Sequence, residues 1–307
     1  MTTLPSRLNP FAKFVAGFVL YALLGGSLRA ATANALQAEV DLAFTGIQGA
    51  AVVVRVADKH VLAAHNLPVL TRRVASPGSS IKPFVLDLLL ESGAVQPQQI
   101  IACRRGLTIA GRKLNCSHPP EMAMFSAQEA LAFSCNSYFV TAATKLRPGE
   151  LERRYMELGF NRPSGLLPGE GEGRVTPAKS VTERQLLAIG VEGIELTPLE
   201  LAAAYLQLAR LDPTNARGSQ RTVLAGLREA TDYGLAQNAK PERLTVAGKT
   251  GTASDPGGEY THAWFAGFAP AQKPEIVIVV FVNRGRGSVE AAQLAHRIFE
   301  AYKRHRP

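Results

Sequence analysis

The stretch Pro77-Gly-Ser-Ser-Ile-Lys-Pro-Phe84 places a serine and a lysine three residues apart, directly before the apolar run Val85–Leu90. This run predicts a helix that ends near Ser92-Gly93, with Ser79 and Lys82 on one face of its start. A serine hydroxyl is a poor nucleophile until a base takes its proton, and a lysine is a base only when neutral. Burial, a neighbouring cation and the helix N-terminus each lower a lysine pKa. Taken alone, the spacing is more typical of a capped helix start.

Ser134-Cys135-Asn136 is the second motif, and it falls in a predicted loop between two helices. A hydroxyl at this place can relay a proton, and an amide can hold a substrate carbonyl. Serine and asparagine are also the usual residues of such loops. The motif therefore gains meaning only together with the others.

Lys249-Thr250-Gly251-Thr252 is the third motif and lies within a predicted strand. Gly251 removes a side chain where a ligand backbone could approach the strand. Lys249 supplies a second cation, while the hydroxyls of Thr250 and Thr252 suit a carboxylate. A lysine in a strand is otherwise usually on a solvated face, so this motif too is ambiguous by itself.

Outward from the motifs, apolar and β-branched strands occur near both ends of the chain. Two are predicted early and three late, at residues 50–57, 60–65, 244–253, 262–269 and 275–283. Terminal helices are predicted at residues 38–44 and from Ser288, as its cap, to about Arg304. The predicted fold class is α/β (α+β). A five-stranded antiparallel sheet is sandwiched by the N- and C-terminal helices, and an all-helical subdomain of about residues 85–240 is inserted between strands 2 and 3.

The N-terminus has the pattern of an export signal. Arg7 and Lys13 precede an apolar run, and small residues follow it as far as Ala33-Asn-Ala35. The 15 uncharged residues between Lys13 and Arg29 would make about 22 Å of helix, against roughly 30 Å for a hydrocarbon core. We therefore expect a signal peptide over residues 1–35, cleaved rather than kept as an anchor, and an exported, extracytoplasmic domain over residues 36–307.

The chain has three cysteines, Cys103, Cys116 and Cys135. The first two flank residues 106–114, which predict a hairpin that turns near Ile109-Ala110 and places the two sulfurs opposite each other. Three states stay open: a Cys103–Cys116 disulfide, which we favour in an exported protein, free thiols, or a metal site that includes His118. The sequence offers no convincing fourth metal ligand, so no metal is assigned.

The net charge is +9, but the Lys and Arg residues are scattered and no nucleic-acid-binding signature accompanies them. No phosphate loop or dinucleotide fingerprint is present, so no organic cofactor is predicted. His262 adjoins the third motif's strand. Because Lys82 already fills the role of a base, His262 is predicted to pack or hydrogen-bond structurally.

Each motif occurs once, in the order S-x-x-K, S-x-N, K-T-G, which is the known signature set of penicillin-binding proteins and class A β-lactamases. From about Gly49 to Tyr302 the chain resembles the transpeptidase domain of penicillin-binding proteins. Besides PGSSIKPF at 77–84, the resemblance includes EALAFSCNSYF at 129–139, LGFNRPSG at 158–165, LTPLELAAAY at 196–205, AGKTGTAS at 247–254 and HAWFAGFAP at 262–270.

The resemblance implies acyl transfer from peptidoglycan stem peptides. Lys82 would deprotonate Ser79 for attack on the carbonyl between two D-alanines, and backbone N–H groups of Ser79 and Thr252 would form the oxyanion hole. Ser134 and Lys249 would relay the proton to the leaving D-alanine. The implied substrate contacts are Asn136, Thr250, Gly251 and Thr252. An amine or water then accepts the acyl group, so transpeptidation and carboxypeptidation both fit, and β-lactam antibiotics would acylate Ser79 and stay bound.

Two alternatives remain. A β-lactamase shares the motifs and could take a hydrolytic glutamate from Glu150, Glu152 or Glu157, although residues 169–173 look like the penicillin-binding family's loop. A sensor that binds β-lactams or muropeptides without turnover is the alternative from another class. No glycan-polymerase domain is recognised in the chain, so a separate polymerase is a candidate partner.

Overall fold

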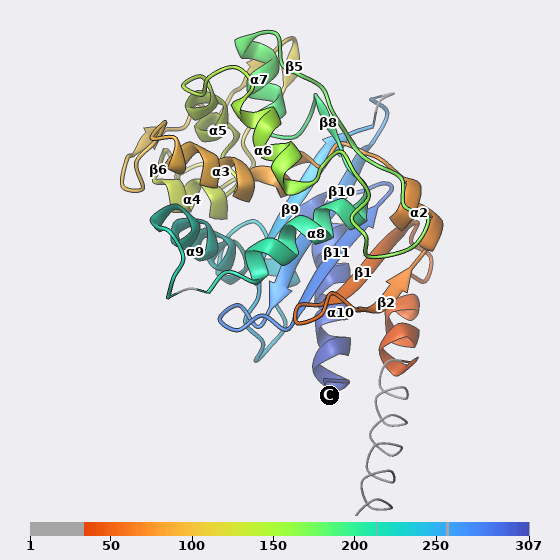
Figure 1. The fold of residues 1–307 in the computed structure, drawn as a ribbon. Helices are drawn as coiled ribbons and strands as arrows, with labels where there is room; N and C mark the ends of the chain where they lie inside the picture. The colour runs from red at the N-terminus through yellow and green to blue at the C-terminus, as the bar shows by residue number, and fades with distance from the viewer. Residues whose placement is uncertain (1–33, 213, 256–257, 307) are drawn as a thin grey trace, which may run out of the picture.

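A five-stranded antiparallel sheet with the order β2-β1-β11-β10-β9 forms the centre of the computed structural model, which describes residues 34–212, 214–255 and 258–306 (Figure 1). The strands are β1 Gly49–Arg55, β2 Val61–His65, β9 Ala247–Ser254, β10 Thr261–Ala269 and β11 Ile276–Val282. The early and late strands join where β1 pairs with β11. The predicted fold class and all five strands are confirmed.

The sheet separates two hydrophobic cores. Successive side chains of a strand point to opposite faces, so Ala51 and Val53 of β1 enter one core, and Val52 and Val54 enter the other. The core with Ala51 contains residues of α10 (Ala292–Arg304) and of the helix at residues 34–43. The other contains α3 (Lys82–Glu91) and α8 (Pro198–Ala209).

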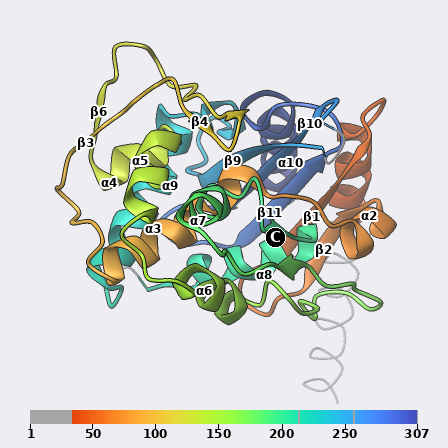
Figure 2. The same ribbon diagram turned by 90° about the horizontal axis from the view of Figure 1, so that it is seen from above.

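The two terminal helices therefore lie on the same face of the sheet, which corrects the expectation that they sandwich it. The insert supplies the opposite layer through α8, visible in front of the sheet in Figure 1 and across the sheet from α10 in Figure 2. The reason is that α8 is apolar nearly all round and needs cover on both sides, whereas α10 is amphipathic and suits an outer position. In Figure 1 the C-terminus lies beside the N-terminal described helix, where Arg304 and His305 pair with Glu39.

The insert between β2 and β9 is mainly helical. Besides α3 and α8 it contains α2 Leu67–Arg72, η1 Gly78–Ile81, α4 Ala127–Ala132, α5 Asn136–Ala143, α6 Glu150–Leu158, α7 Val181–Ala188, α9 Gly218–Asp232 and η2 Gln237–Ala239. It was expected to be all-helical, but it also holds three ladders of two-residue strands. They pair β3 Ile101–Ala102 with β6 Met124–Phe125, β4 Thr108–Ile109 with β5 Arg112–Lys113, and β7 Arg174–Val175 with β8 Ile194–Glu195. These segments lack the apolar periodicity that a packed helix needs.

Helix starts follow the capping signals only in part. The capping boxes Ser126–Glu129 and Thr197–Glu200 form as predicted. Ser288, predicted to cap the last helix, instead lies inside the π-helical turn η3 Gly287–Ala291, and α10 follows without a side-chain cap.

The predicted signal segment falls almost wholly on residues 1–33, outside the described residues. Among the described helices, none combines the length and apolarity needed to cross a bilayer.

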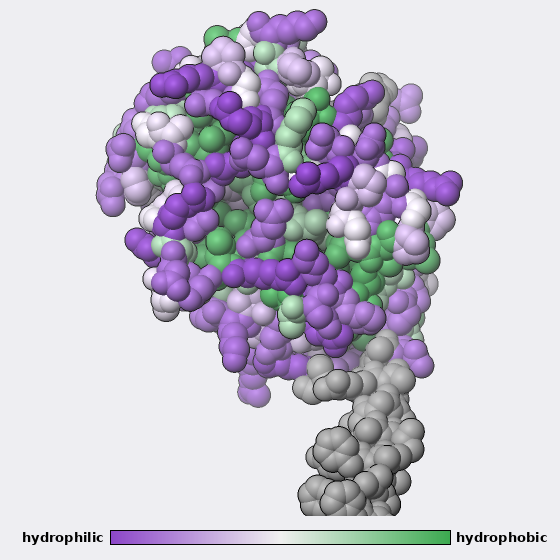
Figure 3. Space-filling view, in the orientation of Figure 1, coloured by the Kyte–Doolittle hydropathy of each residue, from purple (hydrophilic) through white to green (hydrophobic). Residues whose placement is uncertain are grey.

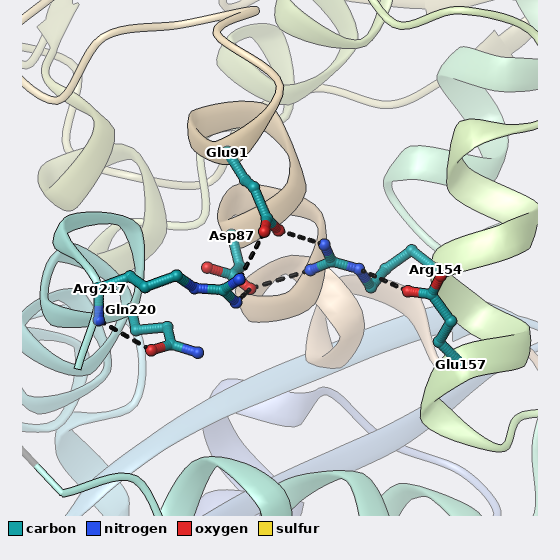
Figure 4. A network of polar contacts seen from close by, with 6 residues as sticks. All are labelled: Asp87, Glu91, Arg154, Glu157, Arg217 and Gln220. Atoms are coloured by element: carbon teal, nitrogen blue, oxygen red, sulfur yellow. Dashed lines mark hydrogen bonds and ion pairs between the residues drawn. The ribbon is translucent and has the colours of Figure 1, made fainter. Parts of the chain in front are cut away.

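Two arginines bind the acidic end of α3 to its helical neighbours (Figure 4). Arg154 of α6 lies 2.9 Å from an Asp87 carboxylate oxygen and also pairs with Glu91. Arg217, at the start of α9, lies 2.5 Å from the other Glu91 oxygen and 3.6 Å from Asp87. The network joins α6 and α9 to α3, the helix that follows the Ser79 turn. Most of the face seen in Figure 3 is hydrophilic, and apolar residues show mainly in hollows between elements. Leu67, the first residue of α2, is an exposed apolar side chain.

Arg154→Ala should lower the free energy of unfolding by about 2 kcal/mol, because it leaves the buried Asp87 carboxylate and the exposed Glu91 carboxylate with Arg217 as their remaining partner. Urea denaturation measures this change. Arg153→Ala, on the exposed side of the same helix, should shift the value by less than about 0.5 kcal/mol. Equal effects of the two substitutions would show that the network contributes nothing specific.

Candidate active site

Ser79 lies half-buried on η1, the 3-10 turn before α3. The sequence predicted it within the first turn of the α-helix, but the helix itself begins at Lys82. A 3-10 turn nearly eclipses residues i and i+3, which keeps the serine and the lysine on one side. Gly78 enters the turn with φ +54°, and the Tyr205 hydroxyl donates to the Ser80 carbonyl at 2.8 Å. The turn is therefore fixed by backbone conformation and by a buried hydrogen bond.

The amine of Lys82 is fully buried. Its Nζ donates to the Ser134 carbonyl at 2.9 Å and to Asn136 Oδ1 at 2.6 Å, and it lies 3.3 Å from Ser134 Oγ. Burial lowers the pKa of Lys82 to about 8, against the opposing effect of the Cys135 and Cys116 thiol groups. A useful fraction of Lys82 is thus neutral near pH 7, as a general base requires.

Ser134 owes its two contacts with Lys82 to an unusual backbone. It has φ +53° in the loop between α4 and α5, a left-handed conformation that costs an L-residue about 1 kcal/mol. The conformation turns both its carbonyl and its hydroxyl toward the Lys82 amine. Asn136 is oriented from its other end, because its Nδ2 donates to the Leu114 carbonyl at 3.0 Å. Sequence reasoning missed Leu114, since a backbone acceptor leaves no residue signature.

Lys249 of β9 is also fully buried, and its Nζ donates to the Thr250 carbonyl at 3.1 Å. Burial, and then the nearby Lys82 amine, hold the pKa of Lys249 well below its ordinary value. The sequence analysis treated this residue as a second cation. Burial instead opposes the charged form of Lys249. Because the Lys82 amine is nearby, a proton on one lysine also disfavours a proton on the other.

A cleft of about 870 Å³ opens over these groups. Five of the predicted side chains line it, namely Ser79, Ser134, Asn136, Thr250 and Thr252. Lys82 and Lys249 lie beneath it. Three separate segments, η1, the α4–α5 loop and β9, therefore bring hydroxyl, amide and amine groups to one cavity, which is the arrangement that acyl transfer by a serine needs.

Gly251 was expected to make room for a ligand backbone, but its neighbours are atoms of the chain itself. A Cβ at this position would lie 2.3 Å from the Pro77 carbonyl oxygen and 3.0 Å from Ser80 N. The missing side chain therefore makes room for the chain's own Ser79 turn, which β9 contacts directly, and not for an approaching ligand. A Cβ on Gly78 would likewise lie 2.4 Å from the Thr252 carbonyl oxygen.

The structure does not form the Cys103–Cys116 disulfide that the sequence favoured: all three cysteines are free, and these two Sγ atoms lie 3.5 Å apart, against about 2.05 Å in a disulfide. The cause is the register of the hairpin. It turns at Ala110-Gly111, both at positive φ, and pairs Thr108 with Lys113 and Ile109 with Arg112. In that register Cys116 N donates to the Arg105 carbonyl, whereas Cys103 N donates to the Ala123 carbonyl, so the two cysteines are not cross-strand partners.

His262 is buried in a structural setting, as expected. Its Nδ1 lies 3.0 Å from the Asn283 carbonyl, and its Nε2 faces Arg73 at 3.4 Å and Asp255 at 3.5 Å. Burial, above all, lowers its pKa. His262 thus links β10 to neighbouring segments.

The family described as penicillin binding protein transpeptidase domain matches residues 49–300. Among relatives, the chain is 26% identical over 304 residues to a peptidoglycan D,D-transpeptidase PbpA of Mycobacterium tuberculosis, a match that covers 80% of the chain and 62% of the relative. It is 27% identical over 263 residues to the stage V sporulation protein D of Bacillus subtilis, covering 73% of the chain and 40% of the relative. The chain thus spans about half the length of these relatives.

Solved structures share the fold. Pseudomonas aeruginosa PBP2 in complex with WCK 5153 matches with a TM-score of 0.76 and 23% identity, over 87% of this chain and 76% of that one. PBP2 of Helicobacter pylori, solved in complex with MreC, matches with a TM-score of 0.78 and 21% identity, over 88% of this chain and 62% of that one.

Gly251→Ala should destabilise the protein by about 1–3 kcal/mol, because the new methyl group must push β9 away from the Ser79 turn. Thermal and urea unfolding would measure the loss. Gly106→Ala is the matched control, because a Cβ there meets no atom within 4 Å. A Gly251→Ala protein as stable as the control would contradict the close contact.

Proposed function

Because the chain belongs to the penicillin-binding protein transpeptidase family, we propose that it is a serine D,D-transpeptidase that acts on the D-alanyl-D-alanine ends of peptidoglycan stem peptides. The single observation that carries the proposal is the buried Lys82 amine with a lowered pKa, held beneath a cleft that Ser79 lines. Its relatives' names as peptidoglycan D,D-transpeptidases favour this activity over carboxypeptidation.

In the first step, neutral Lys82 takes the proton of the Ser79 hydroxyl as Oγ attacks the carbonyl carbon between the two D-alanines. The C–N bond then breaks, and the leaving D-alanine amine receives a proton through Ser134 and Lys249. Ser134 suits this relay because its Oγ lies 3.3 Å from the Lys82 amine. The resulting acyl-Ser79 ester is consumed when the amine of a second stem peptide attacks it and restores the serine hydroxyl.

The backbone N–H groups of Ser79 and Thr252 form the proposed oxyanion hole, a role that the close approach of η1 to β9 supports. Thr250 and Thr252 bind the substrate's terminal carboxylate. The Thr252 Oγ accepts from Gly287 N at 2.9 Å, which leaves its own proton free to donate. Asn136 orients the substrate amide.

We also propose that the domain works outside the cytoplasm, where peptidoglycan is cross-linked, with a separate glycan polymerase as its partner. Covalent binding of β-lactams follows, because a β-lactam presents a strained amide to Ser79. The glutamates considered for a β-lactamase are engaged elsewhere. Glu150 accepts from Arg147 N at 2.7 Å, Glu152 accepts from Ala178 N at 2.7 Å, and Glu157 lies in the Arg154 network.

A fluorescent penicillin should label the protein once, on the tryptic peptide of residues 74–104, with the adduct on Ser79. Mass spectrometry locates it. Ser79→Ala should abolish labelling, whereas Ser80→Ala, which removes a neighbouring hydroxyl bonded to Pro77 O, should keep it. Labelling that survives Ser79→Ala would refute the assignment. D-alanine release from a donor peptide, with and without an acceptor amine, then separates the transpeptidase from a carboxypeptidase and from a non-catalytic sensor.

The rate of acylation by penicillin should rise with pH, because only neutral Lys82 can accept the serine proton. With the Lys82 pKa at about 8, the neutral fraction grows about tenfold between pH 6 and 7, and the rate should level off above about pH 9. Stopped-flow quenching of protein fluorescence across this range measures it. Lys82→Arg should lose the pH rise together with at least about a hundredfold in rate, since a guanidinium stays charged. A rate that is flat from pH 6 to 9 would be inconsistent with a lysine base.

A further inference from the structure

Four potential metal ligands converge behind the cleft, from three separate segments. Cys103 follows β3, Cys116 and His118 lie between β5 and β6, and Cys135 lies between α4 and α5. One ligand atom from each, three Sγ and one imidazole nitrogen, lie within 4.8 Å of one another. The fourth ligand that the sequence analysis lacked is thus Cys135, the central residue of the Ser134–Asn136 motif.

Three of the six distances between these atoms are close to those of a tetrahedral site, and all six are within 4.8 Å. In such a site the metal lies about 2.3 Å from sulfur and about 2.0–2.1 Å from nitrogen, which sets S···S near 3.8 Å and S···N near 3.6 Å. The Cys103–Cys116 and Cys116–Cys135 Sγ distances are 3.5 and 3.9 Å, and Cys103 Sγ lies 3.3 Å from His118 Nε2. A disulfide would require one sulfur pair to approach to about 2.05 Å.

The groups around the cluster suit metal-bound thiolates. Backbone N–H groups donate to sulfur, from Ser137 to Cys116 at 3.5 Å and from Tyr138 to Cys135 at 3.4 Å. Such N–H···S contacts and the hydrophobic shell around a site stabilise and orient its ligands. Cys116, His118 and Cys135 are buried, and Cys103 is partly buried. The contacts that the thiols and the imidazole make with one another are only weak hydrogen bonds.

His118 can present the lone pair of Nε2 to a metal. Its Nδ1 lies 3.1 Å from the Pro119 carbonyl, and an Nδ1–H donated to that oxygen leaves Nε2 free. The Arg105 guanidinium lies 3.1 Å from the same Nδ1, but it has its own acceptors in the Pro119 carbonyl at 2.8 Å and the His118 carbonyl at 2.9 Å. Three thiolates and a divalent cation carry a net charge of minus one. The positive charge of Arg105 offsets this negative charge.

We propose that Cys103, Cys116, His118 and Cys135 bind one Zn²⁺ ion as a closed, structural Cys₃His site. Zinc fits because this metal takes thiolate and imidazole ligands in tetrahedral geometry. All four positions are filled by protein, so the site leaves no open position for a substrate or a catalytic water.

The ion orders the part of the insert that reaches the active site. Residues 99–123 contain only two-residue strands and few buried apolar side chains, so packing alone gives them little stability. Coordination fastens both arms of the β4–β5 hairpin to the α4–α5 loop. It thereby fixes the Leu114 carbonyl, which receives the Asn136 amide, whose oxygen in turn accepts from Lys82. The ion is thus a positioning element for Asn136.

Metal analysis of the full chain, purified without added chelator, tests the proposal. Inductively coupled plasma mass spectrometry should find about one zinc per chain. Cys103→Ala and His118→Ala should each lower zinc retention at least tenfold. Cys103→Asp, which keeps a zinc-binding side chain at the outer position, should retain the metal. Ser117→Ala, an exposed residue between two ligands, is the matched control and should bind like the native chain.

A spectroscopic measurement identifies the ligands. Cobalt(II) chloride added to metal-free protein should give intense tetrahedral d–d bands and thiolate-to-metal charge-transfer bands, which weaken when Cys103 is replaced by Asp. The proposal is overturned if the native chain neither retains zinc nor binds cobalt with its thiols reduced. It is also overturned if mass spectrometry finds a Cys103–Cys116 or Cys116–Cys135 disulfide in the native protein.

Limited trypsin digestion tests the structural consequence. Removing zinc should make cleavage after Arg104, Arg105, Arg112 and Lys113 several-fold faster, whereas cleavage elsewhere should change little. Equal digestion of zinc-loaded and metal-free protein would overturn the positioning role. These readouts are independent of penicillin labelling, so a failure of the zinc site and a failure of the proposed transpeptidase activity are distinguishable.

Discussion

A lysine amine buried among neutral acceptors sets the chemistry of this molecule. Removing an ammonium group from water costs several kcal/mol unless a partner compensates for it. In most proteins the partner is a carboxylate, which raises the lysine pKa and ends its use as a base. The partners of Lys82 are a carbonyl, a hydroxyl and an amide oxygen. They satisfy its hydrogen bonds without supplying a full negative charge, so burial lowers the pKa and leaves an amine that can accept a proton.

Such an amine is useful only if the turn that carries the serine has a fixed position. Glycines allow the neighbouring segments to pack closely around that turn. The Ser79 turn is enclosed by backbone: a Cβ on Gly190 would lie 2.3 Å from the Gly78 carbonyl oxygen, and one on Gly251 would lie 2.3 Å from that of Pro77. A Cβ on Gly287 would in turn lie 2.3 Å from the Gly251 carbonyl oxygen. Four segments distant in sequence therefore meet backbone to backbone. Backbone has fewer soft torsions than side chains, so this stacking gives a rigid site, as catalysis by preorganised groups requires.

The sequence predicted what depends on local pattern and missed what depends on contacts across the chain. The strands and the capping boxes of α4 and α8 are local and form where expected, and two of the three motifs lie in the predicted loop and strand, while Ser79 lies on a 3-10 turn just before its helix. The face of the sheet that α10 covers is not local, because an amphipathic pattern says that a helix has an apolar side but not which layer receives it. Gly251 carries a similar ambiguity: a glycine in a strand indicates close approach, and only the tertiary structure shows that the approaching group is Pro77.

The hairpin of residues 104–115 shows how one turn can change a chemical prediction. A turn centred on Ile109-Ala110 would make Cys116 the cross-strand partner of Cys103, and two cysteines in that relation indicate a disulfide. The actual turn at Ala110-Gly111 moves the register by two residues, so that Cys116 N donates to the Arg105 carbonyl, while Cys103 N donates to the Ala123 carbonyl. The side chains of Cys116 and His118 nevertheless both reach Cys103 Sγ, at 3.5 and 3.3 Å. A disulfide could join only two of the three segments that meet there, whereas a tetrahedral ion joins all of them. The ligand from the third segment is Cys135, so the loop that presents Ser134 and Asn136 to Lys82 is also the loop that the metal would hold.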